Sequence, residues 1–181
     1  MNASNLSALN AVSPIQWFNS TPINLADLTG HVVVLGTFQM LCPGCVTNGL
    51  PQLQRIHDHF DKQQVKVIGL HTVFEHHSAM TPVSLAAFIM EYRLTFPIAV
   101  DGHDQESGPS LSMKRLGLRG TPSLLLVDYA GKIRMHQFGH VGDLVVGAAI
   151  QRLVDELPGS GDCMPGGSQG TDVCTVGGEC N

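Results

Sequence analysis

Short apolar runs of strand length recur along this chain. Residues 31–38, 64–72 and 95–101 are rich in Val, Ile, Leu and Phe and are too short for buried helices. Two further apolar runs lie on either side of residues 129–131, whose sequence Tyr-Ala-Gly is typical of a hairpin turn. The pattern therefore predicts three buried strands followed by a β-hairpin.

Helical periodicity fills the stretches between these runs. In segment 46–60 the apolar residues recur at spacings of four, three, three and four, which forms one stripe of a helix: Val46, Leu50, Leu53, Ile56 and Phe60. Segments 84–93 and 110–118 predict two shorter helices. Residues 142–157 predict a closing helix with Asp143 as its N-cap.

The order of these elements determines the expected fold class. Strands and helices alternate as far as the hairpin, which predicts a mainly parallel sheet with helices on both faces, and the hairpin adds antiparallel strands. We therefore expect one α/β domain with a central mixed sheet over residues 15–157, after an extension at residues 1–14. Residues 158–181 are dominated by Gly, Ser, Asp and Cys, which predicts a flexible tail.

Composition excludes several classes of partner. Of the 181 residues 43% are apolar, enough for one sizeable core. The net charge is −5 and no block of Lys or Arg occurs, so we expect no binding to nucleic acid or to anionic membranes. No stretch approaches the roughly 18 apolar residues of a membrane span, and the first residues lack the features of a signal peptide. A cytoplasmic location is expected.

The candidate chemistry lies at Cys42 and Cys45, directly after the first apolar run and at the start of the first predicted helix. Reaction sites collect at the carboxyl ends of strands in open α/β sheets. A helix N-terminus also offers free N–H groups and partial positive charge, which favour a thiolate. We expect Cys42 to be the nucleophile and Cys45, one turn deeper, to resolve a mixed disulfide.

The residues around this pair resemble a known family. The sequence CPGC after a strand, a proline shortly downstream, and Gly120-Thr121-Pro122 before a strand resemble the thioredoxin fold. The lead-in INLADLTGHVVVLGTF resembles the opening of the TlpA-type and alkyl-hydroperoxide-reductase/thiol-specific-antioxidant (redoxin) branch, as do FPIAVD and LLLVDYAGKI. The resemblance covers roughly residues 17–157 and implies a thioredoxin-like fold with the redox and antioxidant chemistry of that branch.

The resemblance also implies roles for site residues. Pro122 corresponds to a cis-proline that faces the disulfide, so Pro122 and the backbone of Thr121 would dock the substrate. Pro43 and Gly44 would contact the substrate too and set the redox potential through the geometry of the turn. The implied activity is a thiol–disulfide oxidoreductase without metal or cofactor. It would act on protein or small-molecule disulfides and receive electrons from a reductase, its direction in the cell being open.

The match is incomplete at three positions. Leu41 stands where the family has an aromatic residue before the first cysteine. Gly36 stands where thioredoxin carries a buried acid, so proton transfer at Cys45 must use another group or water. Pro51 comes one residue later than the usual spacing, which predicts a small bulge in the first turns of the helix.

A thiol peroxidase that uses Cys42 is one alternative function. Related peroxiredoxins place Thr or Ser three residues before the reactive cysteine and a proline further back, whereas this chain has Gln39 and Leu35 there. Thr37 is out of register, and no arginine that would align a peroxide is identifiable. The exchanger needs only two thiols and the proline, so it is the preferred interpretation.

A metal-binding module is a second alternative. His71, Glu75, His76 and His77 follow the second predicted strand at the same sheet edge as the cysteine pair. Adjacent histidines usually point in opposite directions, and structural zinc at the cysteine pair would lack two nearby ligands. His71 is also a candidate for tuning or protonating the thiols.

Three more cysteines, Cys163, Cys174 and Cys180, lie in the tail. About twenty flexible residues have an average reach of roughly 25 Å, so a tail cysteine could exchange with the active pair as a tethered redox centre. Cys174 and Cys180 could close a small disulfide loop, leaving Cys163 free or intermolecular. The alternative is that the three bind a soft metal, form adventitious dimers or have no role.

Overall fold

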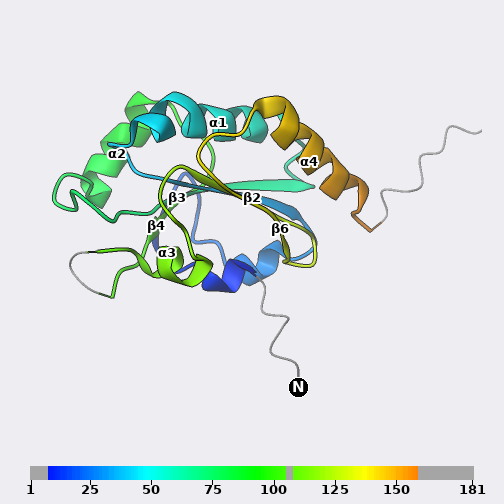
Figure 1. Ribbon diagram of the computed structural model, residues 1–181, viewed down its shortest axis with the longest axis horizontal. Coiled ribbons are helices and arrows are strands. Elements are labelled where there is room, and N and C mark those ends of the chain that lie inside the picture. The colour runs from blue at the N-terminus through cyan, green and yellow to red at the C-terminus, as the bar shows by residue number, and fades with distance from the viewer. Residues whose placement is uncertain (1–7, 105–107, 159–181) are drawn as a thin grey trace, which may run out of the picture.

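A six-stranded sheet crosses the middle of the molecule, with helices above and below it (Figure 1). The computed structural model describes residues 8–104 and 108–158. The strands lie in the order β1-β4-β3-β2-β5-β6. Their bounds are β1 Pro14–Phe18, β2 Val32–Phe38, β3 Val65–His71, β4 Ile98–Asp101, β5 Ser123–Val127 and β6 Ile133–Phe138. The predicted α/β fold with a mixed sheet is confirmed.

Strand directions follow the predicted connections. β2 pairs in parallel with β3, and β3 in parallel with β4, because helices cross over between them. β5 pairs antiparallel with β2, and β6 antiparallel with β5 across the hairpin. The antiparallel edge strand β1, paired with β4, was not predicted. Its sequence lacks apolar alternation, and Ile15 is 68% exposed, so the strand is held by pairing rather than by a buried stripe.

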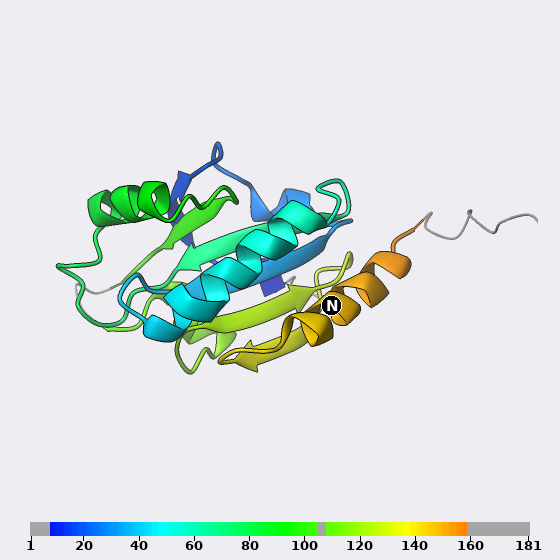
Figure 2. The same cartoon turned by 90° about the horizontal axis from the view of Figure 1, so that it is seen from above.

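Three helices cover one face of the sheet: α1 Leu50–His59, α2 Pro82–Glu91 and α4 Asp143–Asp155. Figure 2 shows α1 crossing the sheet diagonally, with α4 beside it. The opposite face carries α3 Leu111–Leu116 and two 3₁₀ turns, η1 Ala8–Ala11 and η2 Leu25–Leu28 (Figure 1). In the described ranges, no helix combines the length and apolar character that crossing a membrane requires.

The core has two layers because neighbouring strand residues point to opposite faces. In β2, Val32 and Val34 pack under the three-helix face, whereas Val33 and Leu35 pack toward α3. All seven residues of β2 are buried, as expected for a central strand covered on both faces. Leu9, from the N-terminal extension, is also buried in the second layer.

The helix that carries the cysteines begins with the predicted bulge. Cys45–Gly49 forms a π-helical turn, in which the N–H of Leu50 donates to the Cys45 carbonyl five residues earlier. α1 begins at Leu50, so Pro51 falls in its first turn, where a missing N–H is tolerated. The extra residue in the turn accounts for the late position of this proline.

The predicted N-cap of α4 is wrong. Gly142 is the N-cap, with φ −61° and ψ 143°, and Asp143 is the first helical residue. The Asp143 carboxylate instead accepts hydrogen bonds from Gln52 at 2.7 Å and Arg55 at 2.9 Å, both on α1. The acid is therefore used to join two helices rather than to cap one.

Candidate active site

The two cysteines of the CPGC sequence lie at the carboxyl end of β2, at the start of the helix. Both are free thiols. Cys42 is half-buried, whereas Cys45 is fully buried in the core beneath the helix. Pro43, between them, is exposed, and its carbonyl accepts a hydrogen bond from the Thr47 hydroxyl at 2.9 Å. The first cysteine is thus partly accessible from solvent, whereas the second is enclosed in the protein interior.

The sulfur of Cys42 lies between a donor and an acceptor. The backbone N–H of Cys45 donates to Cys42 Sγ at 3.2 Å, and Cys42 Sγ lies 3.5 Å from the carbonyl oxygen of Thr121. A helix-terminal N–H aimed at the sulfur favours negative charge there. The carbonyl can accept a hydrogen bond from the protonated thiol. Both the thiol and the thiolate of Cys42 therefore have a hydrogen-bond partner.

Cys45 is held as a neutral thiol. Burial raises the pKa of its thiol to about 12, and the Cys42 side chain raises this pKa as well. The backbone of Gln39 and the side chain of Thr121 lower it, but by less. At neutral pH Cys45 is therefore protonated until the reaction draws its proton away.

Pro122 packs directly on the helix that carries the cysteines. The Thr121–Pro122 peptide bond is cis. A Cβ atom on Gly44 would lie 3.4 Å from Pro122 Cδ, and one on Gly49 would lie 3.1 Å from Pro122 Cβ. Sequence reasoning included Gly44 but missed Gly49. A glycine within the first turns of a helix, ahead of a late proline, was the available signal.

The position where thioredoxin carries an acid is closed by an apolar side chain. Leu53 from α1 occupies the space that a Cβ on Gly36 would need. A cavity of about 20 Å³ lies beside it, lined by residues that include Gln52, Pro122 and His140. That volume is enough for one water molecule. No carboxylate takes the acid's place on β2.

Gln39, at the position of the peroxiredoxin hydroxyl, is turned into the protein. It is 1% exposed, and its side-chain oxygen accepts a hydrogen bond from the Phe74 N–H at 3.1 Å. Its amide donates to Glu75 at 3.4 Å. The side chain holds the loop after β3 and is not directed at a peroxide on Cys42.

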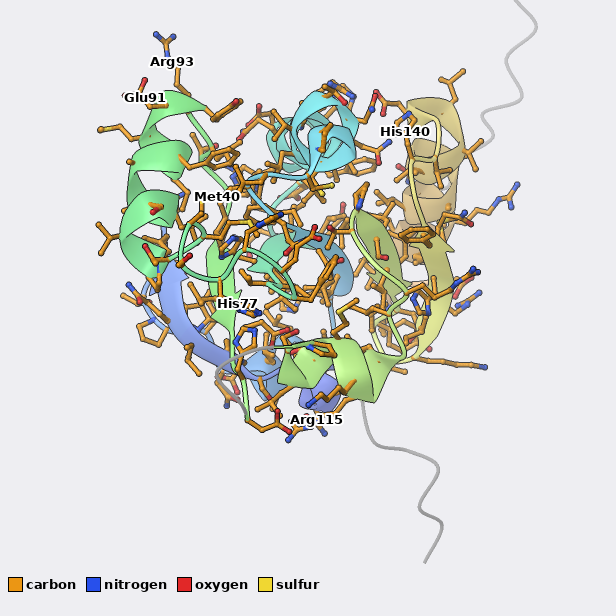
Figure 3. All side chains as sticks on the ribbon, turned by 60° about the vertical axis from the view of Figure 1, so that its left-hand side comes forward. Met40, His77, Glu91, Arg93, Arg115 and His140 are labelled. Atoms are coloured by element: carbon orange, nitrogen blue, oxygen red, sulfur yellow. The ribbon has the colours of Figure 1, made fainter. Side chains whose placement is uncertain are left out.

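The histidines do not form the metal cluster that the sequence suggested. Within residues 8–104 and 108–158, no three His, Cys, Asp or Glu side chains come together to hold a metal ion. Glu75 and His76 are exposed, while His77 is half-buried and its ring meets His103, with centroids 5.3 Å apart. Figure 3 shows His77 well separated from His140 beside α4. The described residues therefore lack the cluster of histidine and acid side chains that the metal-binding alternative requires.

His71 lies at the end of β3 and is completely buried. Its ring packs against Phe38, with centroids 5.3 Å apart, and neither ring nitrogen has a hydrogen-bond partner in the described part of the chain. Burial, with a smaller effect of His103, lowers the pKa of His71 to about 4. His71 is thus neutral at neutral pH, and a role in tuning the thiols stays a prediction.

Two exposed apolar side chains belong to or contact the loops that carry Cys42 and Pro122. Leu41, next to Cys42 in sequence, is 59% exposed. Phe138 is 46% exposed, and its ring lies against Gly120, two residues before Pro122. The Arg119 guanidinium lies 5.8 Å from the centroid of the Phe138 ring. Sequence reasoning missed Phe138 because only the fold brings β6 beside this loop. The three tail cysteines lie outside the described residues.

Comparisons with known proteins agree with this geometry. Residues 12–136 match the AhpC/TSA family. A thioredoxin-like superfamily protein of known structure is 51% identical, with a TM-score of 0.76, over 79% of this chain and 93% of that one. A thiol-disulfide isomerase from Corynebacterium glutamicum is 48% identical, with a TM-score of 0.77 and the same coverage.

A curated relative places similar sequence within a larger protein. NHL repeat-containing protein 2 of Gallus gallus is 28% identical in an alignment of length 172, which covers 84% of this chain but only 23% of the relative. The chain therefore spans less than a quarter of that protein's length.

Proposed function

This chain belongs to the AhpC/TSA family, in the redoxin branch of the thioredoxin-like fold, and on that basis we propose that it exchanges disulfides of protein or small-molecule substrates through Cys42 and Cys45. The observation that carries the proposal is the unequal placement of the two thiols. Cys42 is partly exposed and its Sγ lies 3.2 Å from the Cys45 backbone nitrogen, whereas Cys45 is buried one turn deeper. The isomerase relative, at 48% identity, supports the same chemistry.

The exchange proceeds in two steps. The Cys42 thiolate attacks one sulfur of the substrate disulfide, so that a Cys42–substrate bond forms and the other substrate sulfur leaves as a thiolate and takes up a proton. Cys45 then loses its proton and attacks Cys42 Sγ. The Cys42–Cys45 bond forms, and the second substrate sulfur leaves with the electron pair and is protonated. An electron-donating reductase returns the protein to the dithiol.

The substrate-binding surface in this proposal surrounds Cys42. Pro43 and Gly44 form the turn between the sulfurs, and Thr121 and Pro122 present the facing backbone. The exposed side chain of Leu41 adds an apolar contact beside the reactive sulfur. A peptide that crosses this surface brings its disulfide to Cys42 before Cys45 is engaged.

A thiol peroxidase is the alternative function, because the AhpC/TSA family is named after alkyl hydroperoxide reductase. The contacts of Gln39 argue against a peroxidase, since this side chain is hydrogen-bonded to Phe74 and Glu75. An exchanger requires both cysteines for turnover. A peroxidase requires only Cys42 for its first oxidation step.

The test is insulin reduction with dithiothreitol as donor, run beside hydrogen peroxide consumption. We expect the wild-type chain to accelerate insulin reduction and Cys42→Ser to abolish it. Cys45→Ser should accumulate a mixed disulfide on Cys42, identified by peptide mass mapping. Fast peroxide consumption that survives Cys45→Ser, without insulin reduction by the wild type, would replace the exchanger with the peroxidase.

We also propose that the tail cysteines exchange with this pair, and chain length limits which of them do. α4 has 13 residues, about 20 Å, and its C-terminal end lies on the side of the molecule away from the start of the cysteine helix (Figure 2). Cys163 follows Pro158 by five residues, at most about 18 Å of chain. Cys174 follows it by sixteen, at most about 55 Å. Cys174 and Cys180 are therefore the proposed partners, and Cys163 is not.

A further inference from the structure

Thr121 faces both active-site cysteines. Its carbonyl oxygen lies 3.5 Å from Cys42 Sγ. Its hydroxyl oxygen is buried and has no hydrogen-bond partner among the described residues of the dithiol form, which is unusual because a buried hydroxyl normally finds a partner. The Thr121 side chain nevertheless lowers the pKa of the Cys45 thiol. One residue thus presents its backbone to the attacking sulfur and its side chain to the resolving sulfur.

Cys45 has few other groups that could stabilise its thiolate. It is fully buried, and Cys42 is the titratable side chain that acts on it within the described residues. On β2, the place of an acid is taken by Gly36, with Leu53 packed over it. A buried thiolate without a hydrogen-bond donor is strongly disfavoured. Among the described residues, the groups that lower the pKa of Cys45 are the Gln39 backbone and the side chain of Thr121, whose hydroxyl has no other partner there.

We propose that Thr121 is the positioning residue of the resolving step, its hydroxyl donating a hydrogen bond to Cys45 Sγ as that sulfur becomes a thiolate. The inference rests on the proposed disulfide exchange. In this step the Cys45 proton passes to the departing substrate sulfur by way of solvent. Cys45 Sγ bonds to Cys42 Sγ, and the bond between Cys42 and the substrate breaks with its electron pair on the substrate sulfur. The hydroxyl keeps its own proton throughout.

Ellman's reagent separates the two steps in one experiment. Attack by Cys42 releases one thionitrobenzoate anion, and resolution by Cys45 releases a second. The chain is used at full length, with the three tail cysteines replaced by serine, so that Cys42 and Cys45 are the two thiols that react with the reagent. The ratio of the second rate to the first is measured from pH 6 to 10 for the parent, and for Thr121→Val, Thr121→Ala and Thr121→Ser.

We expect Thr121→Val and Thr121→Ala to lower this ratio roughly tenfold at neutral pH, because a hydrogen bond to a charged group is lost. The rise of the second rate with pH should move to higher pH in both variants. Thr121→Ser, which keeps the hydroxyl, should restore the ratio and the profile. Two truncations are used so that a folding failure of one leaves the other informative.

Thr37→Val is the matched control. Thr37 is also a buried threonine, but on β2, where its hydroxyl lies 3.5 Å from the Ser123 carbonyl. Its replacement should leave the ratio unchanged. A ratio and pH profile of Thr121→Val that match the parent would overturn the inference and leave the exchange mechanism intact. Release of only one thionitrobenzoate anion by the parent would instead overturn the proposed function.

Discussion

A Cβ atom on Gly49 would lie 3.1 Å from Cβ of Pro122, so the backbone of the cysteine-bearing helix rests against the proline ring. Gly49 ends the π-helical turn that starts at Cys45. The turn therefore places a residue without a side chain where the helix meets the loop of Thr121 and Pro122. This contact fixes the distance between Cys42 and the backbone that faces it.

The first prediction is that Gly49→Ala loosens this contact. Alanine suits the backbone of a helix, where it gains up to about 1 kcal/mol over glycine. At this position, however, the added methyl group meets a ring that is fixed in the backbone, and overpacking costs about 1–3 kcal/mol. We expect a net loss of stability of about 1 kcal/mol, measured by urea unfolding, together with slower release of the first thionitrobenzoate anion.

Gly147→Ala is the matched control for that variant. Gly147 lies within α4, and a Cβ there would meet no atom of the described residues within 4 Å. This substitution should raise stability by about 0.5–1 kcal/mol through helix propensity alone. If Gly49→Ala stabilises the protein as much as Gly147→Ala and exchanges at the parent rate, the proline contact has no role in holding the site.

Local sequence patterns were enough to predict much of this structure. Segment 46–60 carries its own stripe and proline spacing, so both the helix and its bulge could be derived from neighbouring residues. β1 could not, because its stability comes from pairing with β4, about 80 residues away. Asp143 was placed at a cap because its partners, on α1, lie about 90 residues away in sequence.

The active site likewise has some features that local sequence predicted and others that depend on residues far apart in sequence. The cysteine pair, its position after a strand and the absent acid at Gly36 were all evident in the sequence. That Leu53 fills the space beside Gly36, and that the Thr121 side chain lowers the pKa of Cys45, follow from tertiary packing. Short-range pattern thus identified the reactive atoms, and only the fold identified the groups that control their protons.

The second prediction concerns alkaline pH. The pKa of Cys45 is about 12 in the folded dithiol because of burial, whereas a thiol in the unfolded chain titrates near 9. Between these values the folded state holds one proton more than the unfolded state, so stability falls as pH rises. We expect the reduced protein to lose about 1.4 kcal/mol per pH unit relative to Cys45→Ala above pH 9. Urea unfolding at pH 8, 9.5 and 10.5 with a phosphine reductant measures this difference. Parallel pH profiles for the two proteins would contradict a strongly raised pKa.

The third prediction concerns acidic pH. Burial lowers the pKa of His71 to about 4, whereas histidine in the unfolded chain titrates near 6.5. Between these values the unfolded state binds the extra proton, so stability is lost as pH falls, by up to about 3 kcal/mol. His71→Leu should remove this loss, and at neutral pH it should cost little because neither ring nitrogen has a hydrogen-bond partner within the described residues. Urea unfolding at pH 7, 6 and 5 compares the two chains. A loss between pH 7 and 5 that is the same in His71→Leu would assign the acid sensitivity to other groups.

The last prediction tests the proposed reach of the tail. Exchange between a tethered thiol and the active pair is equivalent to a free thiol at about millimolar concentration. With only micromolar dithiothreitol as donor, removal of residues beyond Gly159 should therefore slow insulin reduction about tenfold or more. The full-length double variant Cys174→Ser with Cys180→Ser should slow it equally, whereas Cys163→Ser should leave the rate unchanged, because five residues of chain are too short to return past α4. A truncated chain that matches the wild-type rate would show that the active pair takes its electrons directly from the donor, and slowing by Cys163→Ser alone would require exchange between two copies of the chain.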